Sequence, residues 1–273
     1  MKKWAYRILV IVFALTLLIS GGFLVFKYIE GIRAAQDYNS AAEIAGIQGM
    51  KELPSVAPAQ SVQPSPSESG GEAEEEEDPA LLAWLDSMGK TDLSALRKIN
   101  PEVNTWIAIP DSELSYPVMA HTDNTFYLNH TWLGVSNAAG AIFLDGRCSP
   151  DLSDFNTIIY GHRMHNNMMF GTLRFYDNLE YWKEHPRVYL FTDDSVRVYD
   201  IFAAMETPVD SPTYSFGLTE ETDKQAFIDY AVEASVLDTG IVPTTEDSIL
   251  TLSTCTQQGG PQSRWVVQAV LRD

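Results

Sequence analysis

Thr251-Leu252-Ser253-Thr254-Cys255 ends a strand-like run that starts at Ser248, and a polar loop rich in glycine follows it. A strand end beside a loop is a place where a rigid scaffold presents a side chain to solvent. Cys255 is one of only two cysteines in the 273 residues, so no disulfide framework is expected. The stretch alone leaves two readings open, a half-buried core cysteine and an exposed nucleophile.

A histidine stands at the end of a second strand-like run, Asn156-Thr157-Ile158-Ile159-Tyr160, which continues into Gly161 and His162. Gly161 permits a turn at this point. A thiol near pH 7 is mostly protonated and needs a neighbouring base or cation to raise its thiolate fraction. Histidine can do this, and it can later protonate a leaving amine. A histidine at a strand end is also often a hydrogen-bonded structural residue, so His162 alone does not establish a site.

An arginine begins the apolar run that follows Cys255 along the chain. Arg264 precedes Trp265-Val266-Val267, and a hairpin between the two runs would return it beside Cys255 at the same edge of the sheet. A fixed guanidinium there could stabilise the oxyanion that forms when a thiolate attacks an amide. Alone, Arg264 reads as a solvated surface residue. Together, Cys255, His162 and Arg264 form a candidate nucleophile, base and oxyanion donor.

After residue 100, the sequence pattern is mostly typical of β-strands. About eight short apolar runs with irregular connections predict a closed or nearly closed β-barrel, and no repeat of about 20–50 residues suggests a propeller or solenoid. Apolar spacings of three and four predict helices over 81–85 and 92–96, and a helical stripe of core residues within 220–237. The expected strands are 106–109, 116–118, 141–144, 157–160, 188–192, 196–205, 249–254 and 265–271.

The N-terminus contains an uncharged apolar run over residues 8–26. At about 1.5 Å per residue, a helix of this length nearly spans a hydrocarbon core of about 30 Å. Lys2, Lys3 and Arg7 precede the run, so the positive-inside rule places residues 1–7 in the cytoplasm. A cleaved secretory signal is the alternative, although the run is long for one and no clear cleavage site follows it closely. Both readings export the rest of the chain.

Residues 27–79 are expected to form a stalk and then a disordered linker. Residues 28–50 could extend the membrane helix, whereas 39–79 are rich in Ala, Ser, Pro and Gln and contain the acidic run 72–78. Such a segment buries too little apolar surface to offset its ordering entropy. Its prolines would keep it semi-extended and hold the domain of residues 80–273 away from the bilayer. The formal net charge of −19 argues against a nucleic-acid partner.

The ordered motifs resemble those of sortases. Thr251-Leu252-Ser253-Thr254-Cys255 is similar to the TLxTC signature of this family, and the later arginine fits its Cys–His–Arg constellation. The run from Asn156 to His162 resembles the histidine segment of class B. Further segments that follow the class B pattern are Ile99-Asn100-Pro101, Trp106-Ile107, Tyr116-Pro117-Val118, Tyr127-Leu128-Asn129, Ile142-Phe143-Leu144-Asp145 and Met169-Phe170-Gly171-Thr172-Leu173.

The resemblance implies an eight-stranded sortase barrel with N-terminal helices, a helix in the loop before the cysteine strand, and one transmembrane helix. It also implies a reaction in which Cys255 attacks the carbonyl after threonine in a C-terminal sorting signal. An amine of a peptidoglycan precursor then resolves the acyl-enzyme. In this scheme His162 is general acid and then base, and Arg264 positions the substrate and stabilises the oxyanion.

The resemblance further assigns a substrate groove. Thr254 matches the threonine before the family's cysteine and is expected to shape the substrate threonine pocket. Two departures limit what the resemblance assigns: Thr256 and Gln257 stand where some class B members have acidic residues, and the interval from Cys255 to Arg264 is slightly shorter than in some relatives. Cys148 matches no catalytic position and is read as a small, partly buried side chain. The remaining residues expected near the groove are Asn124, Leu128, Tyr214 and Ser253.

No metal or other cofactor is expected. His162 and His165 form a His-x-x-His pair, with His121 and His130 elsewhere, but zinc needs further ligands and a supporting shell. The expected partners are secreted proteins with an NPxT-like or SPxT-like signal, a peptidoglycan amine and the membrane of a Gram-positive-type envelope. A pilin-type polymerase that uses a protein lysine is the alternative. A cysteine hydrolase and a non-catalytic wall-binding module are two further readings.

Overall fold

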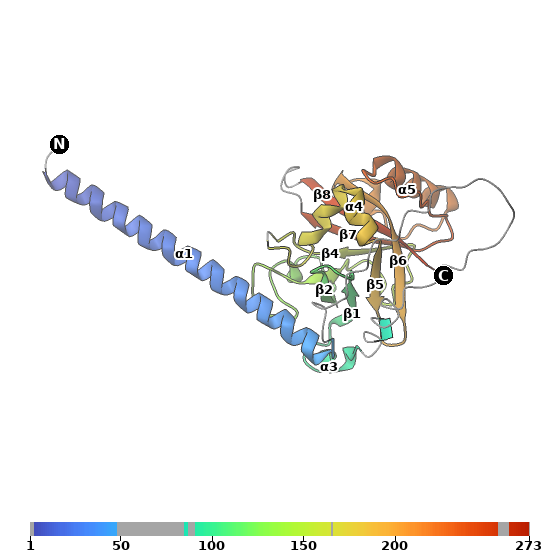
Figure 1. The fold of residues 1–273 in the computed structure, drawn as a ribbon, viewed down its shortest axis with the longest axis horizontal. Coiled ribbons are helices and arrows are strands. Elements are labelled where there is room, and N and C mark those ends of the chain that lie inside the picture. Colours follow the sequence, from blue (N-terminus) through green and yellow to red (C-terminus); the bar gives the residue numbers. More distant parts are fainter. Residues whose placement is uncertain (1–2, 48–84, 87–90, 165, 256–261, 273) are drawn as a thin grey trace.

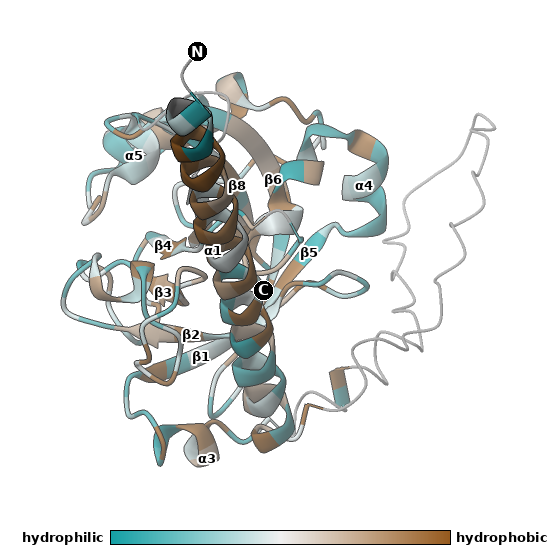
Figure 2. Cartoon of the chain, turned by 90° about the vertical axis from the view of Figure 1, so that its left-hand side faces the viewer, coloured by the Kyte–Doolittle hydropathy of each residue, from teal (hydrophilic) through white to brown (hydrophobic). Residues whose placement is uncertain are grey.

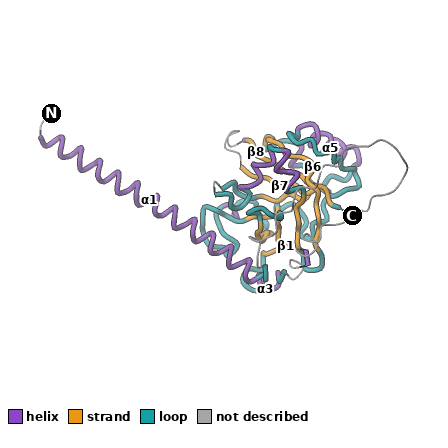
Figure 3. The backbone as a smooth tube through the Cα atoms, in the orientation of Figure 1, coloured by secondary structure: helices purple, strands orange, loops and turns teal. Residues whose placement is uncertain are grey.

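A computed structural model describes residues 3–47, 85–86, 91–164, 166–255 and 262–272. Eight strands close into a barrel in the order β1-β2-β3-β4-β7-β8-β6-β5 (Figures 1 and 3). This confirms the expected mostly-β barrel. The strands are β1 (Val103–Ala108), β2 (Ser115–Ala120), β3 (Ile142–Leu144), β4 (Asn156–Tyr160), β5 (Arg187–Phe191), β6 (Val196–Pro208), β7 (Ile249–Cys255) and β8 (Ser263–Leu271).

The helices of the described part are mostly short and lie outside the barrel wall (Figure 1). Asp92 caps the helix α3 by accepting a hydrogen bond from the backbone N–H of Ala95 at 3.0 Å. Residues 81–84, where the first domain helix is expected, lie outside the described residues. The helices are α1 (Lys3–Ile44), α3 (Leu93–Arg97), η1 (Phe126–Leu128), η2 (Gly171–Asp177), α4 (Leu179–Glu184), η3 (Pro212–Tyr214) and α5 (Glu221–Ala234).

The core fills the barrel and extends to one outer face. Aromatic side chains such as Trp106, Phe143 and Tyr189 are buried in the main core cluster. Outside, the long connection between β6 and β7 contains α5, whose Phe227 and Ala231 pack in a second cluster with residues of β6, β7 and β8. This confirms that the helical stripe within 220–237 is core packing, because its apolar face lies against the barrel.

The N-terminal helix α1 is longer than the expected span of residues 8–26. It is the one described helix that is long and apolar enough to cross a membrane, by length and composition. Its outer part is strongly hydrophobic and its inner part, beside the barrel, is mixed (Figure 2). Tyr38, Ala41 and Ile47, all in the expected stalk, are buried in the same core cluster as the barrel. The stalk and barrel therefore form one packed unit.

The linker sequence joins two points on this unit. Ile47, which precedes residues 48–84, is buried in the core cluster. Leu85, which follows them, is partly buried against the same cluster. Residues 48–84 themselves lie outside the described residues. Because the chain already packs on the barrel at Ala41 and Ile47, the expectation that residues 39–79 hold the domain away from the bilayer does not fit this packing.

A buried polar network ties the central strands together. The side-chain amide of Asn156, on β4, donates to the carbonyls of Thr213 at 3.1 Å and Ser215 at 2.8 Å, and its oxygen accepts from the Thr251 hydroxyl at 2.7 Å. Gln268, on β8, donates to the same hydroxyl at 2.9 Å. The network thus joins β4, β7 and β8 to the segment that contains Tyr214.

We predict that Asn156→Ala lowers the free energy of unfolding by about 2–3 kcal/mol, because it leaves buried hydrogen-bonding groups without partners. Urea denaturation measures this change. The exposed helix variant Gln225→Ala is the matched control, with an expected change within about 0.5 kcal/mol. Equal effects of the two substitutions would contradict the structural role given to Asn156.

Candidate active site

The pairing of β4, β7 and β8 brings the predicted catalytic residues to one end of the barrel. β4 and β7 are parallel, with Tyr160 opposite Ser253, so both strands end on the same side. β8 runs antiparallel to β7 and begins at that side, with Arg264 directly opposite Cys255. This confirms the expected hairpin return of Arg264. The structure describes the backbone of Cys255, and its side chain lies outside the described part.

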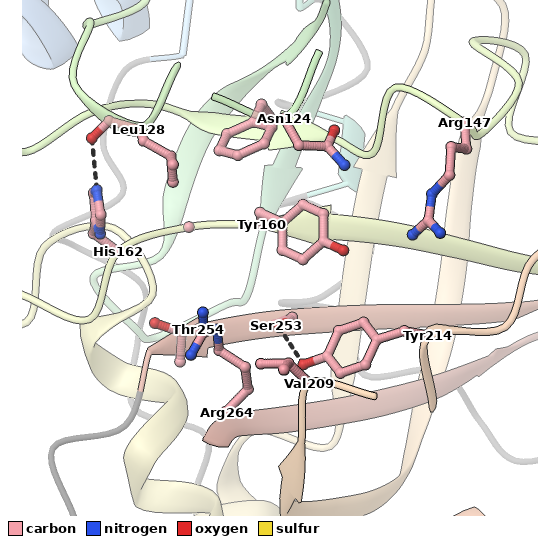
Figure 4. A pocket seen from close by; sticks show the side chains of 12 residues that line it. Asn124, Leu128, Arg147, Tyr160, His162, Val209, Tyr214, Ser253, Thr254 and Arg264 are labelled. Atoms are coloured by element: carbon pink, nitrogen blue, oxygen red, sulfur yellow. Dashed lines mark hydrogen bonds between the residues drawn. The ribbon is translucent and has the colours of Figure 1, made fainter. Parts of the chain in front are cut away.

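A cavity of about 320 Å³ opens at this end of the barrel (Figure 4). It brings together every residue that the sequence analysis placed in the site, Cys255 excepted. Arg147, Tyr160 and Val209 line it as well and were not expected. The full lining is Asn124, Leu128, Phe143, Arg147, Tyr160, Gly161, His162, Val209, Tyr214, Ser253, Thr254 and Arg264.

His162 lies at one end of this cavity, beyond the end of β4 (Figure 4). Its Nε2 is 2.6 Å from the backbone carbonyl oxygen of Leu128. A carbonyl only accepts, so this bond assigns a proton to Nε2. Nδ1 is then the nitrogen that can exchange a proton with a thiol or an amine. Leu128 therefore acts on the site through its backbone as well as its side chain.

The sequence analysis explained the glycine at position 161 by a turn, and the structure gives a different reason for it. Its φ is not in the left-handed region, so no turn demands glycine there. A Cβ at this position would lie 2.8 Å from ring atoms of Phe170. The close approach of the Phe170 ring, which packs under the end of β4, is what requires glycine.

Arg264 approaches the cavity from β8. Its Nη1 donates to the carbonyl of Ser263 at 2.8 Å, and the side chain is partly buried. Its neighbour Trp265 donates from Nε1 to the carbonyl of Leu173 at 2.7 Å, which ties β8 to η2. The guanidinium is thus held at the cavity wall by a fixed strand.

The floor of the cavity contains two hydroxyl groups of β7. The Ser253 hydroxyl lies 2.8 Å from the hydroxyl of Tyr214, which fixes the tyrosine ring over the floor (Figure 4). Thr254 is 2 % exposed, and its hydroxyl has no hydrogen-bond partner among the described residues. Leaving a buried hydroxyl unpaired is costly, and Thr254 is one of the residues that line the cavity.

Arg147 lies at the opposite end of the cavity from His162 (Figure 4). Its Nε and Nη2 donate to the two carboxylate oxygens of Asp145 at 2.9 and 2.6 Å, and its guanidinium lies 4.2 Å from the centre of the Phe216 ring. Tyr160 also donates to Asp145, at 2.9 Å. In the sequence, this cluster was indicated by the class B segment Ile142-Phe143-Leu144-Asp145, which supplies its carboxylate.

Asn124 completes this end of the cavity. Its side-chain oxygen accepts from the backbone N–H of Gly146 at 2.8 Å, and its amide nitrogen donates to the Asp145 carboxylate, which leaves one N–H of that nitrogen for a ligand. Arg147 has only donors, and two of its nitrogens are committed to Asp145. This end of the cavity therefore suits a ligand with hydrogen-bond acceptors, such as carbonyl oxygens.

The other cysteine, Cys148, is an unreactive side chain. Cys148 is 7 % exposed, and its sulfur accepts from the backbone N–H of Ile158 at 3.5 Å. Burial raises the pKa of this thiol to about 11. It is therefore a small buried side chain that stays protonated at neutral pH.

The described residues contain no group of three or more His, Cys, Asp or Glu side chains arranged to hold a metal ion. His121 bonds instead to Glu102, at 2.7 Å, and His130 to the carbonyl of Phe126, at 2.8 Å. His165 lies outside the described residues.

Comparison with known proteins gives consistent matches. Residues 107–272 match the sortase domain. Sortase B of Listeria monocytogenes is 33% identical over 183 residues, which is 67% of this chain and 74% of the relative. A substrate complex of Staphylococcus aureus sortase B has a TM-score of 0.62 at 29% identity, over 66% of this chain and 84% of that one. Sortase B from Bacillus anthracis in complex with AAEK1 has a TM-score of 0.68 at 25% identity, over 89% of this chain and 98% of that one.

The Asp145–Arg147 pair should stabilise the fold in a pH-dependent way. Burial alone would raise the pKa of Asp145, but hydrogen bonds from the Arg147 side chain and backbone and from Asn124 lower it to about 2. A depressed carboxyl pKa gives stability that is present above the unfolded value of 3.8 and lost as pH falls toward 2. We therefore expect the stability of Asp145→Asn to fall less than that of the wild type between these two pH values.

At neutral pH, Arg147→Met should cost about 2 kcal/mol, because it leaves the buried Asp145 carboxylate without its cation. The same substitution in the Asp145→Asn background should cost clearly less. Lys183→Met removes an exposed helical ion pair and is the control, with an expected effect below about 0.5 kcal/mol. Chemical denaturation at each pH measures these values, and equal costs in both backgrounds would contradict the pairing.

Proposed function

This chain belongs to the sortase family, and we propose that it is a membrane-anchored class B enzyme that attaches proteins with a C-terminal sorting signal to the cell wall. Class B sortases are cysteine transpeptidases, and the chain is one of them. The observation that carries the proposal is the cavity that joins His162, Arg264 and Thr254 beside the backbone of Cys255.

In the proposed reaction, Cys255 gives its proton to Nδ1 of His162, and the resulting thiolate attacks the carbonyl carbon of the signal's threonine. Arg264 donates hydrogen bonds to the oxyanion. As the C–N bond breaks, His162 gives a proton to the leaving amine through Nδ1, because Nε2 is bonded to Leu128. A thioester remains. The acceptor amine then attacks the thioester, His162 takes up its proton, and the thiolate leaves.

The same cavity supports a binding mode for the signal. Thr254 lines the catalytic end of the cavity, where the substrate threonine would bind. Tyr214, Ser253 and Leu128 would contact the middle of the peptide. Asn124 and Arg147 offer donors at the far end, which suits an N-terminal residue with a side-chain carbonyl or hydroxyl oxygen. We therefore propose a signal that begins Asn-Pro or Ser-Pro.

The location follows from the N-terminal helix. The apolar part of α1 would span the membrane, with Lys2, Lys3 and Arg7 on the cytoplasmic side and the barrel outside. The proposed acceptor is an amine of a peptidoglycan precursor. We do not favour the pilin-type alternative, because the relatives are class B sortases and none of the described cavity residues suggests a protein lysine as acceptor.

Hydroxylamine in place of the acceptor amine tests the reaction. Wild-type protein and an NPxT-type peptide should yield a threonine hydroxamate, detected by mass spectrometry. Cys255→Ala should abolish it, and His162→Ala and Arg264→Ala should each lower kcat/KM by about a hundredfold or more. Cys148→Ala is the matched control and should retain activity. Hydroxamate formation by Cys255→Ala at the wild-type rate would contradict the mechanism.

A peptide panel tests the proposed signal and acceptor. We expect Asn-Pro or Ser-Pro peptides to have the highest kcat/KM, because their side-chain oxygens match the donors of Asn124 and Arg147. A Leu-Pro peptide as clearly the best substrate would overturn this specificity. In parallel, peptidoglycan fragments with a free amine are compared with lysine peptides. Preference for the lysine peptides would favour the pilin alternative.

A further inference from the structure

The inner part of α1 packs on the barrel as a core element. Ala34, Tyr38, Ala41 and Ala45 recur at spacings of three and four residues, so they share one helix face. All four are at most 5 % exposed. The ring of Tyr38 also packs edge-on against Tyr116 of β2, with ring centres 5.2 Å apart. This part of the membrane helix is therefore built into the catalytic domain.

The polar contacts of this helix converge on one segment of the barrel, residues 130–141. Asn137 donates to the carbonyl of Glu30 at 3.0 Å, and the Glu30 side chain accepts from the backbone of Ala138 at 3.1 Å. Trp132 donates from Nε1 to the carbonyl of Asp37 at 2.8 Å. These contacts hold residues 130–141 against the helix α1.

The hydroxyl of Tyr38 makes the central contact, a 2.6 Å hydrogen bond to the carbonyl of Gly140. A carbonyl oxygen only accepts, so the Tyr38 hydroxyl is the donor in this bond. Gly140 has a φ of +61°, a conformation that favours glycine. The helix thus holds the backbone of this residue at a defined place.

The inner side of Gly140 faces the active site. A Cβ there would lie 2.8 Å from the carbonyl oxygen of Leu128 and 3.0 Å from Cδ2 of His162. That same Leu128 carbonyl accepts from Nε2 of His162 at 2.6 Å. Gly140 therefore lies between the Tyr38 hydroxyl on one side and the His162 ring on the other. The Leu128 carbonyl, which accepts from that ring, lies on the His162 side.

We propose that Tyr38 is a positioning residue for the transpeptidase reaction, and that the membrane helix acts through it to orient His162. The inference rests on the proposed function, since it assigns His162 its role in proton transfer. The helix α1 is continuous from Lys3 to Ile44. The anchor and the catalytic histidine are therefore parts of one rigid unit, and the site is held at a fixed place relative to the end of the membrane span.

The test uses the full-length chain in lipid nanodiscs, with hydroxamate formation as the assay. Tyr38→Phe keeps the ring against Tyr116 and removes the hydroxyl that donates to Gly140. We expect kcat to fall about tenfold while KM stays within twofold, since the substrate groove is unchanged. Tyr28→Phe, on the exposed part of the same helix, is the matched control and should behave as wild type. Trp132→Phe, which removes the bond to Asp37, should lower kcat in the same selective way.

A second readout separates positioning from general destabilisation. The ring ¹⁵N and ¹H signals of His162 should shift in Tyr38→Phe and not in Tyr28→Phe. Unchanged kcat and unchanged His162 signals in both Tyr38→Phe and Trp132→Phe would overturn the inference. A parallel loss of kcat, KM and thermal stability, without a change in the His162 signals, would also overturn it. A wild-type protein that forms no hydroxamate would count against the proposed function instead, and the His162 signals would still test the positioning.

Discussion

The site depends on the parallel pairing of β4 with β7. Because these strands run in the same direction, with Tyr160 opposite Ser253, the residues that follow each of them leave the barrel at one end. β8 starts at that end and places Arg264 opposite Cys255. A slip of one residue would move every side chain of a strand to the opposite face of the sheet. The network around Asn156, which joins the two strands and β8, helps to fix this register.

Much of the barrel and the site could be predicted from the sequence, because the strands are short apolar runs that end at polar or glycine-rich turns. His162, Arg264 and the groove residues that the ordered motifs named all line one cavity. Arg147 was missed, because its place depends on a buried carboxylate and on Phe216, which is distant in sequence. The reason for Gly161 was also missed, since only the packed structure shows the approach of Phe170.

The N-terminal region was the least predictable part. A stripe such as Ala34, Tyr38 and Ala41 is compatible with a solvated stalk, and only the complementary surface of the barrel shows that it is core. The consequence is a change in the role of the acidic linker. Ile47 and Leu85, on either side of it, both pack on the barrel, so the linker does not lie between the anchor and the enzyme.

The central claim is that Cys255, next to His162 and Arg264, forms a thioester with the threonine of a sorting signal. Intact-protein mass spectrometry after brief mixing with an NPxT-type peptide, quenched in acid, tests it most directly. The account predicts an adduct with the mass of the peptide up to threonine, and peptide mapping should place it on Cys255. An adduct on Cys148, or turnover of the peptide by a Cys255→Ser protein without any adduct, would contradict the account.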